Sequence, residues 1–256
     1  MKSARTGGAQ SGDQPLEFLA NPKWIRVLAG GEILADSRRT ILLREPGKPP
    51  TYYFPQDDIR MVRLRPSEHR TYSPPRGRAS YWHVEVRDGL LENAAWSYSG
   101  TREEAPELEA YIAFDWDQMD AWFEEDEQAY AHPRDPYHRV DALRSSRHVQ
   151  VMVGGETVAE SHRPVLVFET GLPVRYYLPL LDVRTELLRP SRRLTRCPYK
   201  GEASYFSLEV AGRSYPDLFW TYRFPTSALC AITGMVSFYQ ERVGRLRVDG
   251  AEEPAD

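Results

Sequence analysis

The residues whose types could do chemistry gather in one turn of the second half of the chain. Cys197 and Lys200 lie three residues apart, and Gly201 follows them. The chain then enters an alternating strand in which Tyr205 and Glu209 share a face. A neighbouring ammonium group favours the thiolate, the nucleophilic form of cysteine. A phenol and a carboxylate could carry protons for it. The turn therefore predicts a catalytic site built from the cysteine, the lysine, the tyrosine and the glutamate.

Three further side chains are expected to bind a substrate at this site. Tyr176 and Tyr177 point to opposite faces of one strand, so one packs in the core and Tyr177 is free to offer its hydroxyl group. Arg163 could bind an anion through two parallel hydrogen bonds, and Thr195 belongs to the same turn as the cysteine. Internal ion pairs that fix the sheet are the favoured alternative, because such pairs are common in β domains. The charged residues that both copies retain would form them, and in the second copy these are Glu169, Arg163, Asp182 and Arg184.

A structural interpretation of the turn competes with the catalytic one. A cysteine often packs as a small apolar side chain, and the lysine beside it would then be solvated. Reactivity requires a special environment, so this interpretation is favoured over a nucleophile. Non-covalent binding of a small molecule is the third alternative.

The turn has a counterpart, because the chain repeats itself. Every matched pair of motifs is 124 residues apart (154 − 30 = 124), and no gap is needed from about residue 25 to about residue 114, with roughly a third of the positions identical. Matched motifs are Gly30-Gly31-Glu32 and Gly154-Gly155-Glu156, Tyr52-Tyr53 and Tyr176-Tyr177, Ala79-Ser80-Tyr81 and Ala203-Ser204-Tyr205, and Trp96 and Trp220. The first copy has Ser73, Pro75 and Arg76 where the second has Cys197, Tyr199 and Lys200. If the turn is functional, the first copy has lost or altered the activity.

Each copy is predicted to consist of short strands separated by turn residues. The strands expected in the first copy are 25–29, 32–37, 40–44, 51–54, 60–65, 80–86, 94–98 and 111–116. Short helices are expected at 103–109 and 227–232, and another around 119–127. Each Gly-Gly pair lies between two alternating apolar runs, which indicates a two-residue hairpin turn.

The pattern predicts a mainly β protein with two similar small antiparallel β-barrel or sandwich domains, each with a short helix. The expected organisation is a disordered tail at 1–20, a first repeat at 21–130, a linker at 131–144, a second repeat at 145–250 and a tail at 251–256. Tandem copies often imitate a twofold dimer. We therefore expect a pseudo-twofold arrangement, in a monomer with an internal pseudo-dimer or in a homodimer.

Composition excludes several classes of function. The net charge of −4 argues against a nucleic-acid partner, which normally requires a basic surface. No apolar run approaches the roughly 20 residues that span a bilayer, and no secretory signal is expected at the N-terminus. Two cysteines suit a reducing cytoplasm. His132, Asp135 and His138 match no metal motif, so neither a metal nor a cofactor is expected.

The motifs of the second copy also resemble a known family. They are Glu169-Thr170-Gly171, Pro173, Tyr176-Tyr177, Pro179, Thr195, Cys197-Pro198, Lys200-Gly201, Ala203, Tyr205, Trp220 and Tyr222, with 132–137 in the linker. From about residue 22 to 249 the chain resembles a double version of the domain of unknown function 427, also classified as a nucleotidyltransferase-type domain. The resemblance implies a compact β-rich fold and a bacterial or fungal distribution, without a defined activity. Nucleotidyltransferases usually hold metal with paired carboxylates near a phosphate-binding loop, and the sequence offers no such arrangement.

The sequence thus predicts a cytoplasmic protein with a small-molecule pocket in the second repeat and leaves open whether it is an enzyme. A non-catalytic interaction or scaffold module built from two repeats is the alternative. An exposed apolar patch without a polar pocket would favour that alternative.

Overall fold

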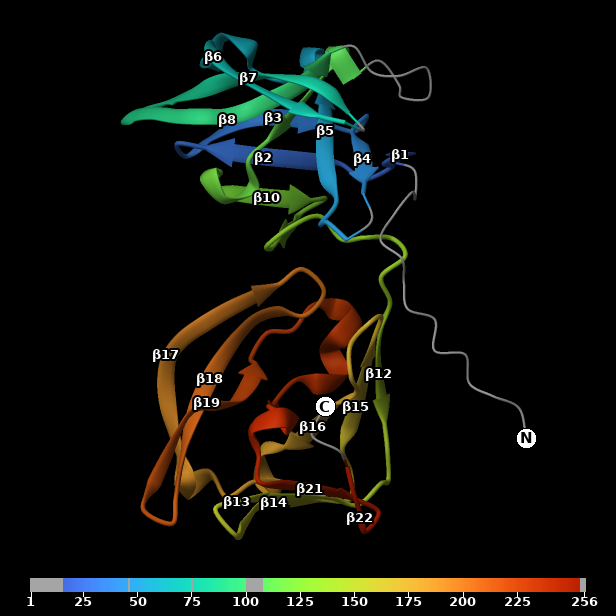
Figure 1. Ribbon diagram of the computed structural model, residues 1–256, viewed down its shortest axis with the longest axis vertical. Helices are drawn as coiled ribbons and strands as arrows, with labels where there is room; N and C mark the ends of the chain where they lie inside the picture. Colours follow the sequence, from blue (N-terminus) through green and yellow to red (C-terminus); the bar gives the residue numbers. More distant parts are fainter. Residues whose placement is uncertain (1–15, 46, 75, 100–107, 254–256) are drawn as a thin grey trace, which may run out of the picture. The chain divides into compact units, whose positions relative to one another are not determined.

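The computed structural model describes residues 16–45, 47–74, 76–99 and 108–253. The chain divides into two compact units between Asp135 and Pro136. Each unit contains one antiparallel sheet of seven strands and one of four, arranged as a sandwich (Figure 1). The predicted mainly β duplication is therefore confirmed, and the described strands form open sheets rather than a closed barrel.

The first unit contains eleven of the described strands. They are β1 (Glu17–Ala20), β2 (Ile25–Ala29), β3 (Glu32–Ser37), β4 (Ile41–Arg44), β5 (Thr51–Pro55), β6 (Leu64–Ser73), β7 (Gly77–Val86), β8 (Gly89–Ser99), β9 (Tyr111–Phe114), β10 (Ala121–Glu124) and β11 (Glu127–Ala129). The sheet orders are β1-β4-β5-β9-β8-β7-β6 and β11-β10-β2-β3. Short 3₁₀ turns are η1 (Gln56–Asp58), η2 (Met61–Arg63), η3 (Leu108–Ala110) and η4 (Trp116–Gln118).

The second unit repeats this plan. Its strands are β12 (Val140–Arg144), β13 (Val149–Val153), β14 (Glu156–Ser161), β15 (Val165–Glu169), β16 (Arg175–Pro179), β17 (Leu188–Cys197), β18 (Gly201–Val210), β19 (Arg213–Tyr222), β20 (Met235–Phe238), β21 (Arg245–Val248) and β22 (Ala251–Glu252). The sheet orders are β12-β15-β16-β20-β19-β18-β17 and β14-β13-β21-β22. Its 3₁₀ turns are η5 (Leu180–Asp182), η6 (Thr185–Leu187), η7 (Ser227–Ile232) and η8 (Gln240–Arg242).

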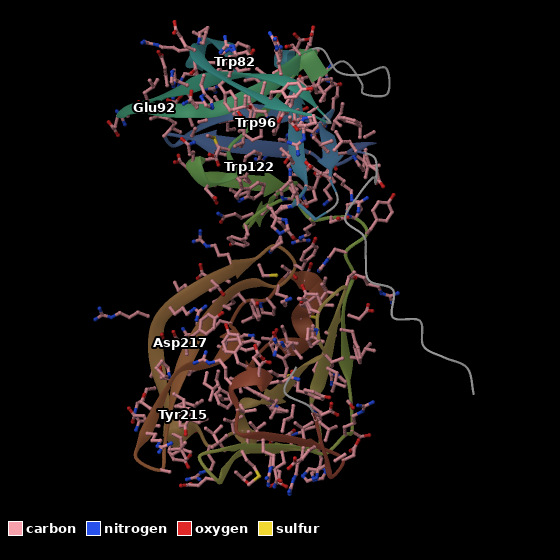
Figure 2. All side chains as sticks on the ribbon, in the orientation of Figure 1. Trp82, Glu92, Trp96, Trp122, Tyr215 and Asp217 are labelled. Atoms are coloured by element: carbon pink, nitrogen blue, oxygen red, sulfur yellow. The ribbon has the colours of Figure 1, made fainter. Side chains whose placement is uncertain are left out.

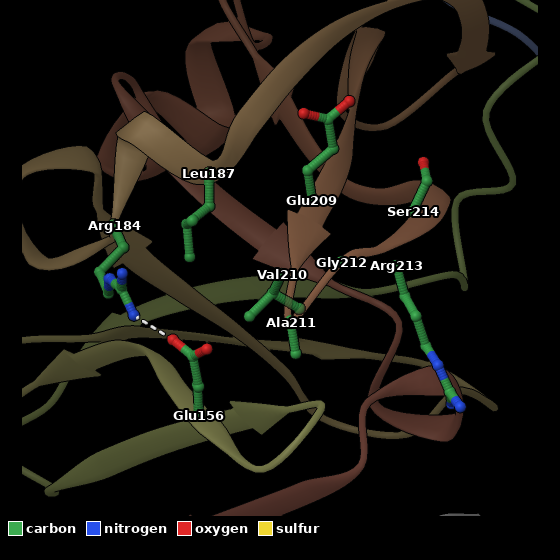
Figure 3. Close-up of a pocket in the computed structure, with 9 residues that line it drawn as sticks. All are labelled: Glu156, Arg184, Leu187, Glu209, Val210, Ala211, Gly212, Arg213 and Ser214. Atoms are coloured by element: carbon green, nitrogen blue, oxygen red, sulfur yellow. Dashed lines mark hydrogen bonds and ion pairs between the residues drawn. The ribbon is translucent and has the colours of Figure 1, made fainter.

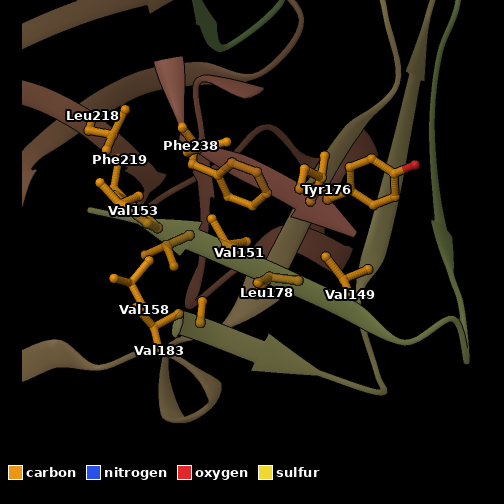
Figure 4. Packing of buried hydrophobic residues seen from close by; sticks show 14 of the residues in the cluster. Val149, Val151, Val153, Val158, Tyr176, Leu178, Val183, Leu218, Phe219 and Phe238 are labelled. Carbon is orange, nitrogen blue, oxygen red and sulfur yellow. The ribbon is translucent and has the colours of Figure 1, made fainter. Parts of the chain in front are cut away.

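Both faces of the seven-stranded sheet of the second unit are covered. Side chains alternate between the faces of a strand, so Tyr176 joins the apolar cluster that faces the four-stranded sheet and includes Val151 and Phe238 (Figure 4). Tyr177 joins a separate cluster on the opposite face, which we call the second face and which is completed by Leu229 and other residues of η7. Both members of the Tyr-Tyr pair are thus buried, at 4% and 1% exposure.

The Gly-Gly hairpin turns are present as predicted. Gly30 has φ of +62°, and a Cβ atom added there would lie 2.8 Å from the Cβ of Val86. Only glycine meets both the left-handed backbone and this close approach without strain.

The helix predicted around 119–127 is wrong. That segment contains β10 and the start of β11, and β10 pairs with β2. Trp122 is buried at 3% exposure, and Glu124 accepts a hydrogen bond of 2.9 Å from the hydroxyl of Tyr52. Strand pairing and this buried contact therefore override the local acidic composition that suggested a solvated helix.

Other boundaries differ from the expectation by a few residues. Within the strand predicted at 60–65, Met61–Arg63 is a 3₁₀ turn and β6 begins at Leu64. The helix predicted at 227–232 is confirmed as η7, in 3₁₀ form. Of the helix predicted at 103–109, residues 103–107 lie outside the described residues, and 108–110 form η3.

The expected tails and linker also contain strands. Glu17–Ala20 forms β1 and Val140–Arg144 forms β12, each paired with the strand that follows the Gly-Gly hairpin of its own unit. Ala251–Glu252 forms β22. Residues 1–15 and 254–256 lie outside the described part of the chain.

Candidate functional site

The turn that carries the cysteine and the lysine connects β17 to β18 and is held by the segment after β19. The backbone N–H of Thr226 donates a hydrogen bond to the carbonyl oxygen of Lys200 at 3.2 Å. The hydroxyl of Thr226 donates a second hydrogen bond to the carbonyl oxygen of Tyr199 at 2.6 Å. Gly201 has φ of +100°, and an added Cβ would lie 3.1 Å from the carbonyl oxygen of Phe224. The turn is therefore fixed in its backbone.

A nearly buried cluster of charged groups joins this turn to the end of β15. The Lys200 ammonium group forms an ion pair with one carboxylate oxygen of Glu169, and Nε2 of His138 lies 3.1 Å from the other. The side chains are 12%, 9% and 24% exposed, respectively. The ring of Tyr199 stacks on His138 with a centroid distance of 4.3 Å. Three separate segments thus converge on one carboxylate.

Cys197 lies close enough to two buried phenols to contribute to their pKa values. Burial raises the pKa of Tyr177, and the nearby Glu169 and Cys197 raise it further, although a hydrogen bond from the indole N–H of Trp220 at 3.1 Å acts in the opposite direction. Burial also raises the pKa of Tyr222, and Tyr177 and Cys197 contribute to it. The thiol and the two neutral phenols therefore share one environment with the charged cluster.

Thr195 and Tyr205 lie next to this environment on the second face. Their hydroxyl oxygens are 2.9 Å apart, and the hydroxyl of Tyr239 lies 3.5 Å from that of Tyr205. Tyr205 is only 6% exposed and packs against Trp220. These two predicted site residues therefore belong to the same face as Cys197. Tyr205 is part of the buried aromatic cluster of that face.

Glu209 lies elsewhere. It is half exposed, forms an ion pair of 3.0 Å with Arg189 and lines an open hollow of about 440 Å³ near the far end of β18 (Figure 3). The hollow also contains the ion pair between Arg184 and Glu156, at 2.8 Å. Eight residues separate Glu209 from the glycine that begins β18, which corresponds to roughly 26 Å of strand.

Arg163 is also remote from the turn. Its guanidinium group makes two hydrogen bonds to the carboxylate of Asp182, at 2.8 and 3.1 Å. It precedes β15, whereas Glu169 ends that strand, six residues or roughly 20 Å later. The ion pair that the sequence favoured for Arg163 is therefore formed.

The first unit repeats the frame of the site but not its reactive groups. Arg76 forms an ion pair with Glu45. Trp96 donates to the hydroxyl of Tyr53 at 3.2 Å, and the hydroxyls of Thr71 and Tyr81 are 3.0 Å apart. The ion pair, the Trp–Tyr bond and the Thr–Tyr bond are thus features of the fold. A serine replaces the cysteine in this copy, and the position matching His138 is Gln14, which lies outside the described residues.

Sequence reasoning did not assign the acid and the histidine of the cluster to the site. Glu169 is one of the polar residues that both copies retain, and this was the available signal. Sequence reasoning considered His138 with His132 and Asp135 as a metal ligand, and not as a partner of Glu169. Among the described residues, no group of three or more such side chains is arranged to hold a metal ion.

The chain was also compared with known proteins. A family model described as a domain of unknown function (DUF427) matches residues 17–125 and again residues 141–249. No curated protein matches the chain. Within the described residues, no helix has the length and apolar character needed to cross a membrane.

Proposed function

Because the chain belongs to the family of domain of unknown function 427 and contains two copies of that domain, we propose that the second copy has kept or gained a small-molecule site that the first copy lacks. The site is centred on Cys197. Lys200 and Glu169 form its ion pair, His138 contacts the same carboxylate, and Tyr177 is its neutral hydrogen-bond donor.

The chemistry of these groups is that of a thiol nucleophile with proton carriers. The Cys197 sulfur would add to a carbonyl carbon of the ligand, so that the sulfur–carbon bond forms as the carbon–oxygen π bond opens. The thiol proton would pass to the carbonyl oxygen through the carboxylate and the imidazole that share a hydrogen bond. Burial keeps the Tyr177 phenol protonated. Its oxygen accepts a hydrogen bond from Trp220, and its proton would be donated to the ligand.

The comparison between the copies carries the proposal. Both copies have the ion pair, the Trp–Tyr bond and the Thr–Tyr bond, so the fold is maintained without a thiol, a lysine or a histidine at this place. The second copy alone combines Cys197, Lys200 and His138. Groups that the fold does not require are the ones expected to bind a ligand or react with it. The proposal assigns the protein to a reducing cytoplasm, where such a thiol stays available.

Alkylation by iodoacetamide tests the thiol. Cys230 is exposed, so the experiment uses Cys230→Ser as the background. We expect Cys197 to react faster than the exposed thiol of the reciprocal variant Cys197→Ser. Lys200→Arg should slow the reaction at Cys197 although it retains a positive charge, because a guanidinium group cannot donate or accept protons as an amine can. Equal rates with and without the Lys200→Arg replacement would contradict a role for the amine.

A thermal-shift screen against metabolites tests the ligand. A molecule present at 100 times its dissociation constant adds about 2.7 kcal/mol of stability. We expect the shift to disappear in Cys197→Ser and to remain in the matched first-copy variant Ser73→Ala. A ligand whose shift survives Cys197→Ser, and which leaves the alkylation rate of Cys197 unchanged, would show that the thiol is not part of its site.

A non-catalytic interaction module is the second candidate function. Leu180 and Leu181 in η5 are 41% and 90% exposed, and the first copy has Gln56 and Asp57 at the same positions. The double replacement Leu180→Gln and Leu181→Asp should abolish self-association in sedimentation if these leucines form a contact. A monomer before and after the replacement would exclude self-association through η5.

A further inference from the structure

Three arginines of the second unit lie over three aromatic rings of the second face. The guanidinium carbon of Arg193 is 4.7 Å from the ring centroid of Tyr205. Arg242 lies 5.1 Å from Tyr239, and Arg175 lies 5.9 Å from Trp220. The rings contact one another, with Trp220 and Tyr239 only 4.8 Å apart. This arginine-aromatic cluster draws on β16, β17, β18, β19 and the segment after β20.

The three guanidinium groups are only partly neutralised. Arg175 makes a bidentate ion pair with Glu241, at 2.8 and 3.4 Å. Arg193 is 44% exposed, and Asp217 (labelled in Figure 2) lies 3.8 Å away, too far for a hydrogen bond. Arg242 donates to the backbone carbonyl of Pro216 at 2.6 Å rather than to a carboxylate. Three cations thus face two carboxylates, and Arg193 keeps donors available.

The matching positions of the first copy, all of them described, do not carry this cluster. Its residues at the positions of the three arginines are Thr51, His69 and Gln118, and Asp115 replaces the tyrosine at 239. His69 packs edge-on against Tyr81 at 4.6 Å, and Tyr81 lies 6.4 Å from Trp96. Two of the three rings are therefore retained, while the third ring and the three arginines are replaced. The fold therefore does not require the arginines, and they are specific to the copy that has the thiol.

We propose that the ligand of the second copy is a planar organic anion. Its carboxylate or phosphate is bound by Arg193 and Arg242, since a planar guanidinium fork matches both groups. Its ring lies against the guanidinium and aromatic layer at Tyr239, where stacking and cation–π attraction act together.

The geometry connects this anion to the thiol. Arg193 covers the ring of Tyr205, and Thr195 contacts the hydroxyl of the same tyrosine. Arg193, Thr195 and Cys197 therefore follow one another along the second face of β17, over roughly 13 Å. A ligand held at Arg193 extends toward Cys197, so this inference names the ligand class of the proposed thiol site and rests on that proposal.

Calorimetric titration of the full chain tests the ligand class with matched probes. Adenosine 5′-monophosphate is compared with adenosine, benzoate with benzamide, and both anions with inorganic phosphate. We expect at least one organic anion to bind at least tenfold more tightly than its neutral analogue and than phosphate. Raising the salt concentration should weaken this binding, because exposed charges are screened. Equal affinity of an anion and its neutral analogue, or no binding of any probe, would overturn the inference.

Variants locate the site. The double replacement Arg193→Gln and Arg242→Gln should weaken anion binding at least tenfold, and Arg193→Lys should restore part of it in the presence of Arg242. His69→Gln at the matching position of the first copy should leave it unchanged. Near-ultraviolet circular dichroism checks that the packing of Tyr205, Trp220 and Tyr239 is unchanged. Unchanged binding in the double variant with an intact spectrum would refute the assignment to these arginines.

Protection of Cys197 separates the two proposals. An anion that requires the arginines and slows alkylation of Cys197 supports both. An anion that requires the arginines but leaves the alkylation rate unchanged overturns the thiol site and its link to the anion. A ligand that slows alkylation equally in wild type and in the double variant overturns only the anion inference.

Discussion

Lys200 and Glu169 are almost removed from water, and an ion pair in such a place must recover the cost of desolvation through good geometry and further hydrogen bonds. His138 supplies a second contact to the same carboxylate. The first copy fastens the corresponding turn with Arg76 and Glu45. The pair therefore has a structural role in both copies, and the change from arginine to lysine adds a group that can exchange a proton.

This double role predicts different results for two replacements of Lys200. Lys200→Met removes one partner of a buried pair and should lower the free energy of unfolding of the second unit by about 3 kcal/mol. Lys200→Arg restores the pair found in the first copy and should cost less than about 1 kcal/mol. Urea unfolding measures both, with Arg76→Lys as the reciprocal control. Equal losses for methionine and arginine would mean that the charge does not hold the turn.

The buried tyrosines predict how stability depends on alkaline pH. Burial raises the pKa values of Tyr53, Tyr177 and Tyr222 in the folded protein. At a pH above about 10, the ordinary phenol value, the unfolded chain loses these protons while the folded chain retains them, so stability falls as pH rises. Phenolate absorbance should therefore appear in two phases, the later one coinciding with unfolding. Tyr177→Phe should reduce the amplitude of the later phase, and a single phase before unfolding would contradict this.

At the scale of elements, an aspartate of a 3₁₀ turn accepts hydrogen bonds from a serine and an arginine near the end of a strand in each unit. In the second unit, Asp182 of η5 accepts hydrogen bonds from Arg163 and from the hydroxyl of Ser161, the latter at 2.7 Å. In the first unit, Asp58 accepts from Arg39 and from Ser37 in the same way. In each unit these hydrogen bonds connect the end of β3 or β14 to the 3₁₀ turn that follows β5 or β16.

The hydrogen bonds to Asp182 predict a loss of stability in acid. The hydrogen bond from Arg163 lowers the pKa of Asp182 in the folded protein. Its contribution is therefore present above the ordinary aspartate pKa of about 3.9 and is lost as pH falls toward the lower folded value. Asp182→Asn should lower the thermal midpoint at neutral pH, and the difference from wild type should shrink below about pH 4. A difference that does not change with pH would indicate a loss of packing instead.

Hairpins and faces could be predicted from the sequence, because they depend on neighbouring residues. Gly30-Gly31 and the alternation of Tyr176 and Tyr177 are local signals. The contact between Glu169 and Lys200 joins residues 31 positions apart, through the order of seven strands, and no local spacing shows it. Glu209 shares a face with Tyr205 in the pattern, but a register shift between Phe206 and Leu208 and the length of β18 separate the two environments.

At the scale of the whole molecule, each unit has apolar clusters of its own. The two clusters of the second unit consist of residues between 140 and 248, and those of the first unit lie between 16 and 129, among the residues described. Each unit thus has its own core, which is the property that lets a domain fold alone. The two copies could therefore diverge, so that the second has a thiol and three arginines that the first lacks, while both have a core and the ion pair at the turn.

Separate expression of the second unit tests this independence. A chain of residues 136–253 should unfold cooperatively, because both of its apolar clusters and the three segments that meet at Glu169 are included. A chain of residues 145–253, which begins where the sequence placed the second repeat, lacks β12. It therefore loses the pairing of β12 with β15 and the packing of Val140 and Ala142 on the second face. It also lacks His138. We expect this shorter chain to be several kcal/mol less stable, since burial of one such aliphatic side chain contributes roughly 1.5–3 kcal/mol. Urea unfolding of the two chains measures the difference. Equal stability would show that β12 belongs to the linker after all, and failure of the longer chain to fold would show that the second unit depends on the first.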